Sequence, residues 1–179
     1  MAELVDALVS NTNEETRAGS TPALGTKSHL TMKKIKLNKQ KRYDIAYLRM
    51  AIEWSKLSKC KRKKVGALIV KDNMIISDGY NGTPAGFDNE CEDENGLTNW
   101  YVLHAEANAI LKTAASTHDC TNSTLYLTLS PCKECSKLIV QSKIKRLVYI
   151  NKYKDETSLH FLSQMGIEIE QITLDELSE

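Results

Sequence analysis

Four side chains in two short motifs could form one chemical site. His104 and Glu106 lie two residues apart, and Cys132 and Cys135 form a Cys-x-x-Cys pair directly after Pro131. One histidine and two cysteines are zinc-type ligands, and three protein ligands leave a tetrahedral zinc with one open position for water. Structural zinc sites are instead closed by four protein ligands. We therefore predict a catalytic zinc held by His104, Cys132 and Cys135, with Glu106 as the proton shuttle.

Both motifs are predicted at the starts of helices. His104 opens an alanine- and leucine-rich segment over 104–115, and Ser130-Pro131 is a favoured N-cap and N1 pair for a helix that runs to about 142. Free N–H groups and the helix dipole at a first turn favour the thiolate form of cysteine. Zinc lowers the pKa of its water, so a nearby carboxylate could pass that proton to a ring nitrogen and to a departing amine. The motifs therefore predict hydrolytic loss of ammonia from a base.

A closed structural zinc site is the alternative for the Cys-x-x-Cys pair. It would need a fourth ligand, and the nearest candidates, His118 and Cys120, lack motif spacing. We expect Cys60, Cys91 and Cys120 to be small buried or loop residues, with a second structural zinc at Cys91 as the other option. Five cysteines, an odd number, favour metal ligation in a reducing compartment over a disulfide framework.

The periodicity of apolar residues predicts the elements that hold these motifs. We expect helices at 43–59, 104–115, 130–142 and 156–165, and strands at 65–70, 74–77, 124–129, 146–150 and 167–172. The first two strands form a hairpin, whereas the later strands alternate with helices and should be parallel. The predicted fold is a three-layer α/β/α sandwich on a mixed five-stranded sheet. The loop that follows the hairpin is long, and we expect its acidic run to be a solvated rim (Glu90, Glu92, Asp93 and Glu94).

Composition and charge narrow the class of protein. The 179 residues fit one soluble domain, no apolar run reaches the roughly 18 residues of a membrane span, and the N-terminus lacks a secretory signal. We therefore expect a cytoplasmic protein without a membrane partner. The net charge of +1 conceals a basic segment, 33–64, with 13 of the 24 lysines and arginines. This segment could face a phosphate or a nucleic acid, although a solvated helix flank and loop would have the same composition.

Residues 1–31 differ in composition from the rest of the chain. They hold two clusters of turn- and disorder-type residues, at 10–13 and 19–22. Segments 1–9 and 18–26 can also be back-translated into the D-arm and T-arm consensus of a leucine tRNA gene. We therefore expect a disordered or spurious extension over 1–31, and a single domain over 32–179 that starts at Met32.

Four stretches resemble the deoxycytidylate (dCMP) deaminase family of the zinc-dependent cytidine deaminase superfamily. They are KVGALIV at 64–70, GYNGTPAG at 79–86, VLHAEANAI at 102–110 and TLYLTLSPCKECSKLI at 124–139. With the later VYINKY segment, the resemblance covers roughly 43–172. The His-x-Glu and Pro-Cys-x-x-Cys motifs are shared by zinc-dependent nucleobase deaminases in general. The glycine-rich stretch is the part that looks specific to the dCMP branch.

The resemblance implies a reaction and a substrate pocket. The three metal ligands and Glu106 match the residues that convert dCMP to dUMP and ammonia, which supplies dUMP for thymidylate synthesis. Asn81 matches a contact to the sugar, and Tyr153 matches a tyrosine near the mouth of the pocket. The backbones of Ala105 and Ser130 should hold the pyrimidine edge. The basic residues at 61–64 could attract the 5′-phosphate.

The resemblance also implies regulation and assembly. The stretch with Gly79, Tyr80, Gly82 and Gly86 is similar to a loop that binds an allosteric nucleotide, with dCTP activating and dTTP inhibiting. We accordingly predict one catalytic Zn²⁺, Mg²⁺ accompanying a nucleotide effector, and a homo-oligomer. Nucleic acid is not expected as a partner.

The sequence is also compatible with two other functions. One is a zinc-bound nucleic-acid or competence-related binding protein of the same fold, and the other is a deaminase that acts on polynucleotide or tRNA bases. The intact Glu106 argues against a binding protein, because binding needs no proton shuttle. The tRNA adenosine deaminases share the parallel last strand but lack the long loop before His104, and free-cytidine deaminases close with a hairpin.

Overall fold

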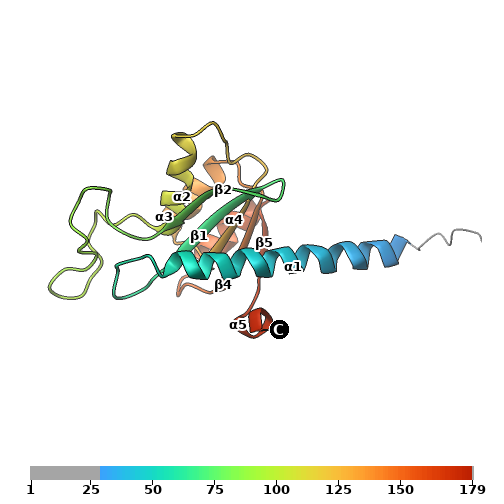
Figure 1. The fold of residues 1–179 in the computed structure, drawn as a ribbon, viewed down its shortest axis with the longest axis horizontal. Helices are drawn as coiled ribbons and strands as arrows, with labels where there is room; N and C mark the ends of the chain where they lie inside the picture. Colours follow the sequence, from blue (N-terminus) through green and yellow to red (C-terminus); the bar gives the residue numbers. More distant parts are fainter. Residues whose placement is uncertain (1–28, 179) are drawn as a thin grey trace, which may run out of the picture.

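A computed structural model describes residues 29–178, with side chains described over 39–177 (Figure 1). Its elements follow the order α-β-β-α-β-α-β-α-β-α: α1 His29–Ser55, β1 Gly66–Lys71, β2 Met74–Tyr80, α2 Ala105–Ala114, β3 Thr124–Leu129, α3 Lys133–Gln141, β4 Arg146–Asn151, α4 Thr157–Gln164, β5 Glu168–Gln171 and α5 Leu174–Ser178. Most of the extension predicted at 1–31 lies outside the described residues. Residues 29–31, the last three of the predicted extension, belong to α1, so this helix crosses the predicted boundary at Met32.

The five strands form one mixed sheet with the order β2-β1-β3-β4-β5. β1 pairs antiparallel with both β2 and β3, whereas β3, β4 and β5 run parallel. Parallel neighbours need a crossover connection, and α3 and α4 supply the two that this half of the sheet requires. The predicted mixed five-stranded sheet is therefore confirmed, including its parallel last strand.

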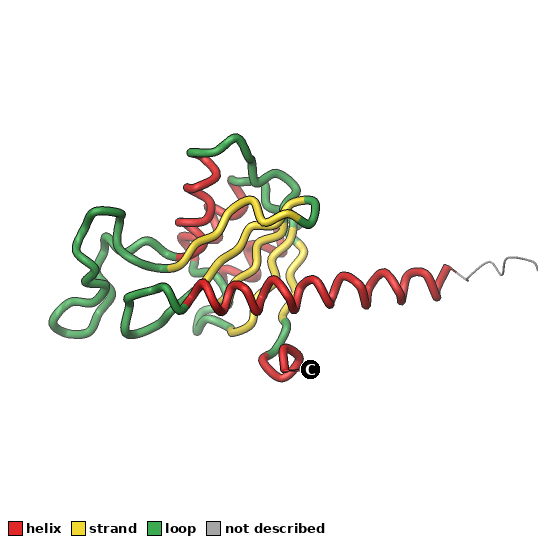
Figure 2. Tube along the Cα trace, in the orientation of Figure 1, coloured by secondary structure: helices red, strands yellow, loops and turns green. Residues whose placement is uncertain are grey.

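Alternation along each strand divides the core between the two faces of the sheet. On β1, Ala67 and Ile69 pack with residues of α2, α3 and α4, whereas Leu68 and Val70 pack with α1 and α5. Strands buried on both faces carry continuous apolar runs, as β1 and β3 do. The three-layer sandwich is therefore confirmed, with α1 lying along one face and continuing beyond the sheet (Figures 1 and 2).

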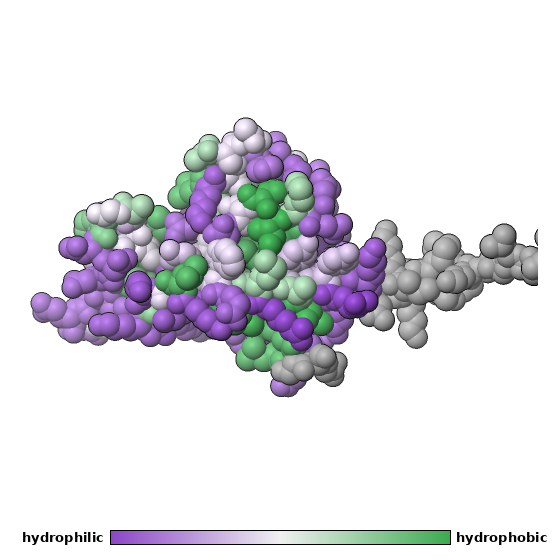
Figure 3. Space-filling view, viewed as in Figure 1, coloured by the Kyte–Doolittle hydropathy of each residue, from purple (hydrophilic) through white to green (hydrophobic). Residues whose placement is uncertain are grey.

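The β1–β2 hairpin closes through a two-residue turn. Asp72 and Asn73 both have positive φ, +51° and +61°. This conformation matches the right-handed twist of the paired strands, and Asp and Asn adopt it more readily than most residues. β2 is one of the two edge strands of the sheet. Figure 3 shows apolar residues gathered over this hairpin, where Met74 and Ile75 are exposed.

Boundaries of three predicted elements were wrong. The first helix, expected over 43–59, begins at least 14 residues earlier and ends at Ser55. β2 continues to Tyr80 instead of ending at Ser77, because Gly79 and Tyr80 still find partners in β1. The third helix begins at Lys133, with Cys132 as its N-cap, because Ser130 still bonds to the neighbouring strand: its N–H donates to the backbone oxygen of Asn151, and its hydroxyl accepts the N–H of Tyr153. The C-terminal residues also form the short helix α5, which the sequence did not predict. Among the described residues, no helix is long and apolar enough to cross a membrane.

Candidate active site and metal centre

A cavity of about 310 Å³ opens where the starts of α2 and α3 meet the end of β3. Most of its wall comes from connections between elements, which bring together segments distant in the sequence. The lining residues include Cys60, Arg62, Lys63, Val65, Asn81, Glu92, Thr98, Val102, His104, Ala105, Glu106, Leu129, Ser130, Cys132, Tyr153 and Lys154. The cavity is therefore bordered by both predicted motifs.

His104, Cys132 and Cys135 come together at one side of this cavity. Nδ1 of His104 lies 3.5 Å from the Cys132 sulfur and 3.4 Å from the Cys135 sulfur. Ligands at about 2.3 Å (sulfur) and about 2.0–2.1 Å (nitrogen) from one tetrahedral zinc lie roughly 3.5 Å apart. The observed spacing and the donor set therefore fit zinc. Among the described residues, this is the one group of three or more possible ligands.

The ligands are positioned by two helix N-termini, as predicted. His104 is the N-cap of α2 and Cys132 is the N-cap of α3, both with extended backbones, and Cys135 lies in the first turn of α3. The hydrogen bond between the two cysteines lowers the pKa of Cys132 to about 3. The same hydrogen bond, together with burial, raises the pKa of Cys135. One thiolate therefore forms readily, and a bound cation would favour the second.

Glu106 lies in the first turn of α2 and is 4% exposed. Burial raises the pKa of its carboxyl group, because a charged carboxylate is poorly solvated there. The residue borders the same cavity as His104 and Cys132. A buried carboxyl group at this position can accept and return a proton, which is the function that the sequence predicts for it.

Residues 41–151 match the family model of the cytidine and deoxycytidylate deaminase zinc-binding region, and this range contains the three candidate ligands and Glu106. The chain belongs to this deaminase family.

Named relatives of the chain include two curated proteins. A probable deoxycytidylate deaminase of Caenorhabditis elegans is 40% identical over 126 residues, or 66% of this chain and 62% of the worm protein. The ComE operon protein 2 of Bacillus subtilis is 38% identical over 125 residues, or 67% of this chain and 66% of that protein. The chain therefore spans slightly less than two thirds of the length of each.

A solved structure of the family is also similar. The dCMP deaminase of cyanophage S-TIM5, in complex with dCMP and dUMP, has 46% sequence identity and a TM-score of 0.70. The comparison covers 71% of this chain and 94% of the phage protein. This likeness agrees with the mixed sheet and the crossover helices described above.

Gly79 lets the deaminase helix α2 approach the sheet closely. A Cβ atom at this position would lie 2.2 Å from the backbone oxygen of Ala105 and 2.7 Å from the backbone nitrogen of Ala109. Ala105 directly follows His104, so the missing side chain allows the start of α2, beside His104, to lie against β2. Gly79 thus allows a close backbone approach within a strand.

The other members of the predicted effector stretch lie apart from this cavity. Tyr80, the last residue of β2, accepts a hydrogen bond from Asn108 through its backbone oxygen. Gly82 exchanges two backbone hydrogen bonds with Leu103, and Gly86 has a φ of +84°. None of the four borders the cavity described above. Their function in effector binding remains a prediction.

Asn81 lines the cavity, but its side chain also holds the connector between α1 and β1. Its Oδ1 atom accepts the backbone N–H of Val65 at 2.7 Å, and its Nδ2 atom donates to the backbone oxygen of Lys63 at 2.8 Å. Its own backbone oxygen accepts from Ser58. Asn81 therefore shapes the wall of the pocket, and its contact to a sugar stays a prediction.

The remaining predicted substrate residues also border the cavity. Ala105, Ser130 and Tyr153 all line it, and the Lys63 ammonium lies 5.4 Å from the centre of the Tyr153 ring. The pocket thus brings together the residues predicted to hold the base and the sugar.

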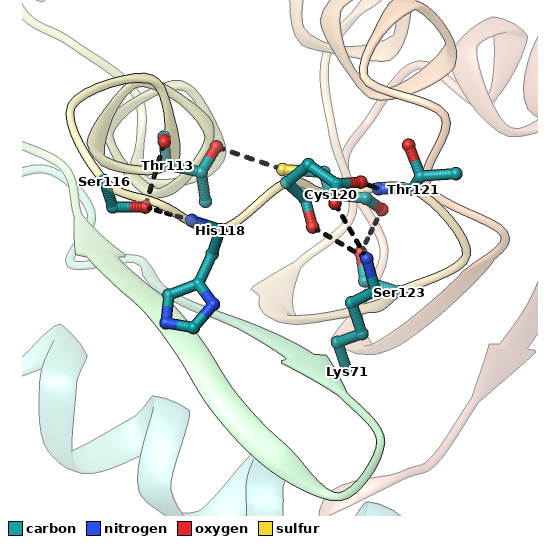
Figure 4. Close-up of polar contacts among 8 residues, drawn as sticks. Lys71, Thr113, Ser116, His118, Cys120, Thr121 and Ser123 are labelled. Atoms are coloured by element: carbon teal, nitrogen blue, oxygen red, sulfur yellow. Dashed lines mark hydrogen bonds and ion pairs between the residues drawn. The ribbon is translucent and has the colours of Figure 1, made fainter.

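The predictions for the other cysteines were partly wrong. Cys60 and Cys91 are buried, as expected, but they form a disulfide, whereas the cysteine count had favoured metal ligation over disulfides. Cys120 is buried, as expected, and contacts the Thr113 hydroxyl at 3.2 Å. Figure 4 shows Cys120 with Thr113, and the exposed His118 ring directed away from it. His118 and Cys120 therefore do not close the metal centre.

Sequence reasoning also missed the inward turn of Glu92. Glu90, Asp93 and Glu94 are exposed, as a solvated rim requires, but Glu92 is half-buried and accepts the backbone N–H groups of Lys61 and Arg62. An acidic run gave no signal that one member would turn inward. Of the basic residues at 61–64, Arg62 and Lys63 border the cavity, and their attraction of a 5′-phosphate stays a prediction.

Proposed function

We propose that the protein catalyses the zinc-dependent hydrolytic deamination of dCMP to dUMP and ammonia, and so supplies dUMP for thymidylate synthesis. The observation that carries the proposal is the buried Glu106 carboxyl group beside a zinc-type triad in one cavity. Membership of the deaminase family supports it. Further support comes from the names of the deoxycytidylate deaminase relatives and from the dCMP and dUMP bound in the cyanophage structure.

Zinc bound by His104, Cys132 and Cys135 would supply Lewis-acid activation of water near neutral pH. Glu106 takes up a proton from the attacking water at its carboxylate and delivers it to the pyrimidine ring nitrogen. It then takes the second proton from the hydroxyl group added to the ring carbon and gives it to the amine, so that ammonia leaves as the carbonyl forms, and one buried carboxyl group serves both halves of the reaction. Its raised pKa suits this task, because the protonated form persists closer to neutral pH.

The proposal gives each of the other predicted residues a part of the nucleotide to contact. The backbones of Ala105 and Ser130 hold the pyrimidine edge, while Asn81 contacts the sugar and Tyr153 covers the mouth of the pocket. All four residues border the cavity, which supports these assignments.

Three cations border the same cavity and form the phosphate side of the proposed site. Arg62 and Lys63 come from the connector after α1, and Lys154 follows β4. A guanidinium group can bind two phosphate oxygens at once, and lysine adds a point charge. A nucleotide would therefore bind more tightly than the corresponding nucleoside.

Regulation, assembly and location are included in the proposal as predictions. They comprise dCTP and dTTP as effectors, Mg²⁺ with the effector, a single catalytic zinc, a homo-oligomer and a cytoplasmic protein. The cytoplasmic assignment rested partly on cysteines that stay reduced, and the Cys60–Cys91 bond removes that support. Assaying dCMP turnover with and without each effector would test the regulation directly.

An absorbance assay tests the function with four substrates: dCMP, CMP, deoxycytidine and a cytosine-containing oligonucleotide. We expect turnover of dCMP and a loss of at least about a thousandfold in Glu106→Gln, because the shuttle acts in both proton transfers. Turnover of none of the four with zinc bound would favour the binding protein. Turnover of the oligonucleotide alone would favour an enzyme that acts on polynucleotides.

A further inference from the structure

The loop between β2 and α2 contains a miniature hairpin that faces the connector between α1 and β1. Glu92 and Thr98 pair across it in an antiparallel bridge. The Asp93 carboxylate closes its turn by accepting the N–H groups of Asn95 and Leu97 at 2.9 and 2.8 Å. Directly opposed residues of an antiparallel pair project to the same face. Glu92 and Thr98 therefore approach the connector together.

The hairpin holds the connector at three consecutive residues. The Glu92 carboxylate accepts the backbone N–H of Lys61 at 3.0 Å and that of Arg62 at 3.0 Å. Cys60, the residue before them, is bonded to Cys91, the residue before Glu92. A carboxylate that accepts two N–H groups fixes the direction of both peptides, since these charge-assisted bonds are among the stronger ones in proteins. The disulfide and the two hydrogen bonds therefore fix the hairpin and the connector relative to each other.

The Arg62 side chain is held from the same hairpin. Its Nη1 atom donates to the Thr98 hydroxyl at 3.3 Å, and Arg62, Glu92 and Thr98 all border the cavity. Asn81 fixes the other end of the connector through Lys63 and Val65. An arginine whose backbone and guanidinium are both fixed binds a phosphate with less loss of conformational freedom.

We infer that Glu92 is a positioning residue that acts through Arg62: it fixes Arg62 at the mouth of the pocket to receive the phosphate of the nucleotide. The inference rests on the proposed function, because it takes the substrate to be a nucleotide. Glu92 does not touch the phosphate, which its own negative charge would repel. Its two N–H partners offset that charge and keep the carboxylate turned toward the connector.

Steady-state kinetics with dCMP test this inference in a set of variants. Glu92→Ala should raise KM by about tenfold and change kcat by less than about twofold, because the lost contact serves binding alone. Glu92→Gln keeps an acceptor oxygen and should restore most of the affinity. Glu90→Ala is the matched control, since Glu90 contacts Asn99 and Tyr101 through its backbone oxygen, and it should leave both parameters unchanged.

A double-mutant comparison separates positioning from a general effect on folding. Arg62→Ala should raise KM at least as much as Glu92→Ala does. The double variant should have the same KM as Arg62→Ala alone, because the effects of residues that act through one another are not additive. An unchanged KM in Glu92→Ala would overturn the inference. A full additional loss in the Arg62→Ala background, or an equal fall of kcat, would also overturn it.

Calorimetric titration with dUMP reads phosphate binding without turnover. We expect weaker dUMP binding by Glu92→Ala than by wild type, by the same factor as the change in KM. A wild type that leaves dCMP unconverted would count against the proposed function. Equal dUMP affinity of wild type and Glu92→Ala would count against the positioning by Glu92, so the two failures can be told apart.

Discussion

Asp44 of α1 and Arg146 at the start of β4 form a two-pronged ion pair beneath the helix. The two guanidinium nitrogens lie 2.8 and 2.9 Å from the two carboxylate oxygens, and the side chains are 1% and 14% exposed. Tyr126 donates to the same carboxylate at 2.7 Å, and Glu170 also contacts Arg146. The pair ties the long N-terminal helix to the parallel half of the sheet that carries the metal motif.

Removing the Asp44 charge should destabilise the fold. Asp44→Ala leaves the Tyr126 hydroxyl without its acceptor and Arg146 with part of its charge unpaired, and breaking a buried pair from one side costs about 3 kcal/mol. Urea unfolding would measure this loss. The exposed Glu53–Lys56 pair provides the control, because Glu53→Gln should change the free energy of unfolding by at most about 0.5 kcal/mol. Similar losses in both variants would contradict this prediction.

The same pair should contribute to acid unfolding. Burial raises the pKa of Asp44, but hydrogen bonds from Arg146, Tyr126 and Gln40 outweigh it, so the pKa lies below its ordinary value of 3.8. A lowered pKa in the folded state stabilises the protein above the unfolded-state pKa, and this stabilisation is lost as the pH falls through the folded-state pKa. We expect Asp44→Asn to flatten the fall of stability below about pH 4. An unchanged acid slope would argue against it.

The sequence predicted the sheet well because the information was local. Leu125 and Leu127 pack on one face of the sheet, and Tyr126 between them packs on the other face. The turn residues Asp72 and Asn73 lie directly between the two strands that they connect. The candidate metal site could be predicted for the same reason, since residue type, spacing and helix starts all lie within two short motifs, and the structure brings its three side chains together. Each of these signals can be read without knowing the contacts between distant segments.

Features that depend on distant pairing were missed. Cys60 and Cys91 meet only because the loop after β2 folds back onto the connector, and no spacing rule indicates that return. Glu92 stands in an acidic run whose other members are exposed, so composition predicts solvent for all of them. The end of β2 was misjudged because glycine normally weakens a strand, whereas Gly79 is required there by the approach of α2.

Zinc content should distinguish the ligand cysteines from the other buried free cysteine. Cys135→Ser should lose most of the bound zinc, because a hydroxyl group is a much poorer zinc ligand than a thiolate. Cys120→Ser makes the same chemical change at a buried site whose neighbour is Thr113, and it should keep its zinc. Metal analysis of the purified variants by mass spectrometry measures both. Equal zinc content in the two variants would overturn the ligand assignment.

The Cys60–Cys91 bond should stabilise the protein under oxidising conditions. It closes a segment of 31 residues, and the chain-entropy relation gives about 3–4 kcal/mol for a loop of that length. We expect a reducing agent to lower the midpoint of thermal unfolding in wild type but not in the Cys60→Ser/Cys91→Ser double variant. Thiol labelling of the unfolded protein serves as the independent check. Five reactive thiols before any reduction would mean that the bond does not form.

A methyl group at Gly79 should disturb the metal centre, although the residue is not a ligand. Gly79→Ala would push α2 outward, because the new atom would lie 2.2 Å from the Ala105 oxygen, and the shift would reach His104 next to it. We expect a loss of about 2 kcal/mol in stability and weaker zinc retention against a chelator. Gly82→Ala is the matched control, since its new atom would meet nothing closer than 4.0 Å. If both variants kept zinc equally well, the packing of α2 on β2 would not set the geometry of the site.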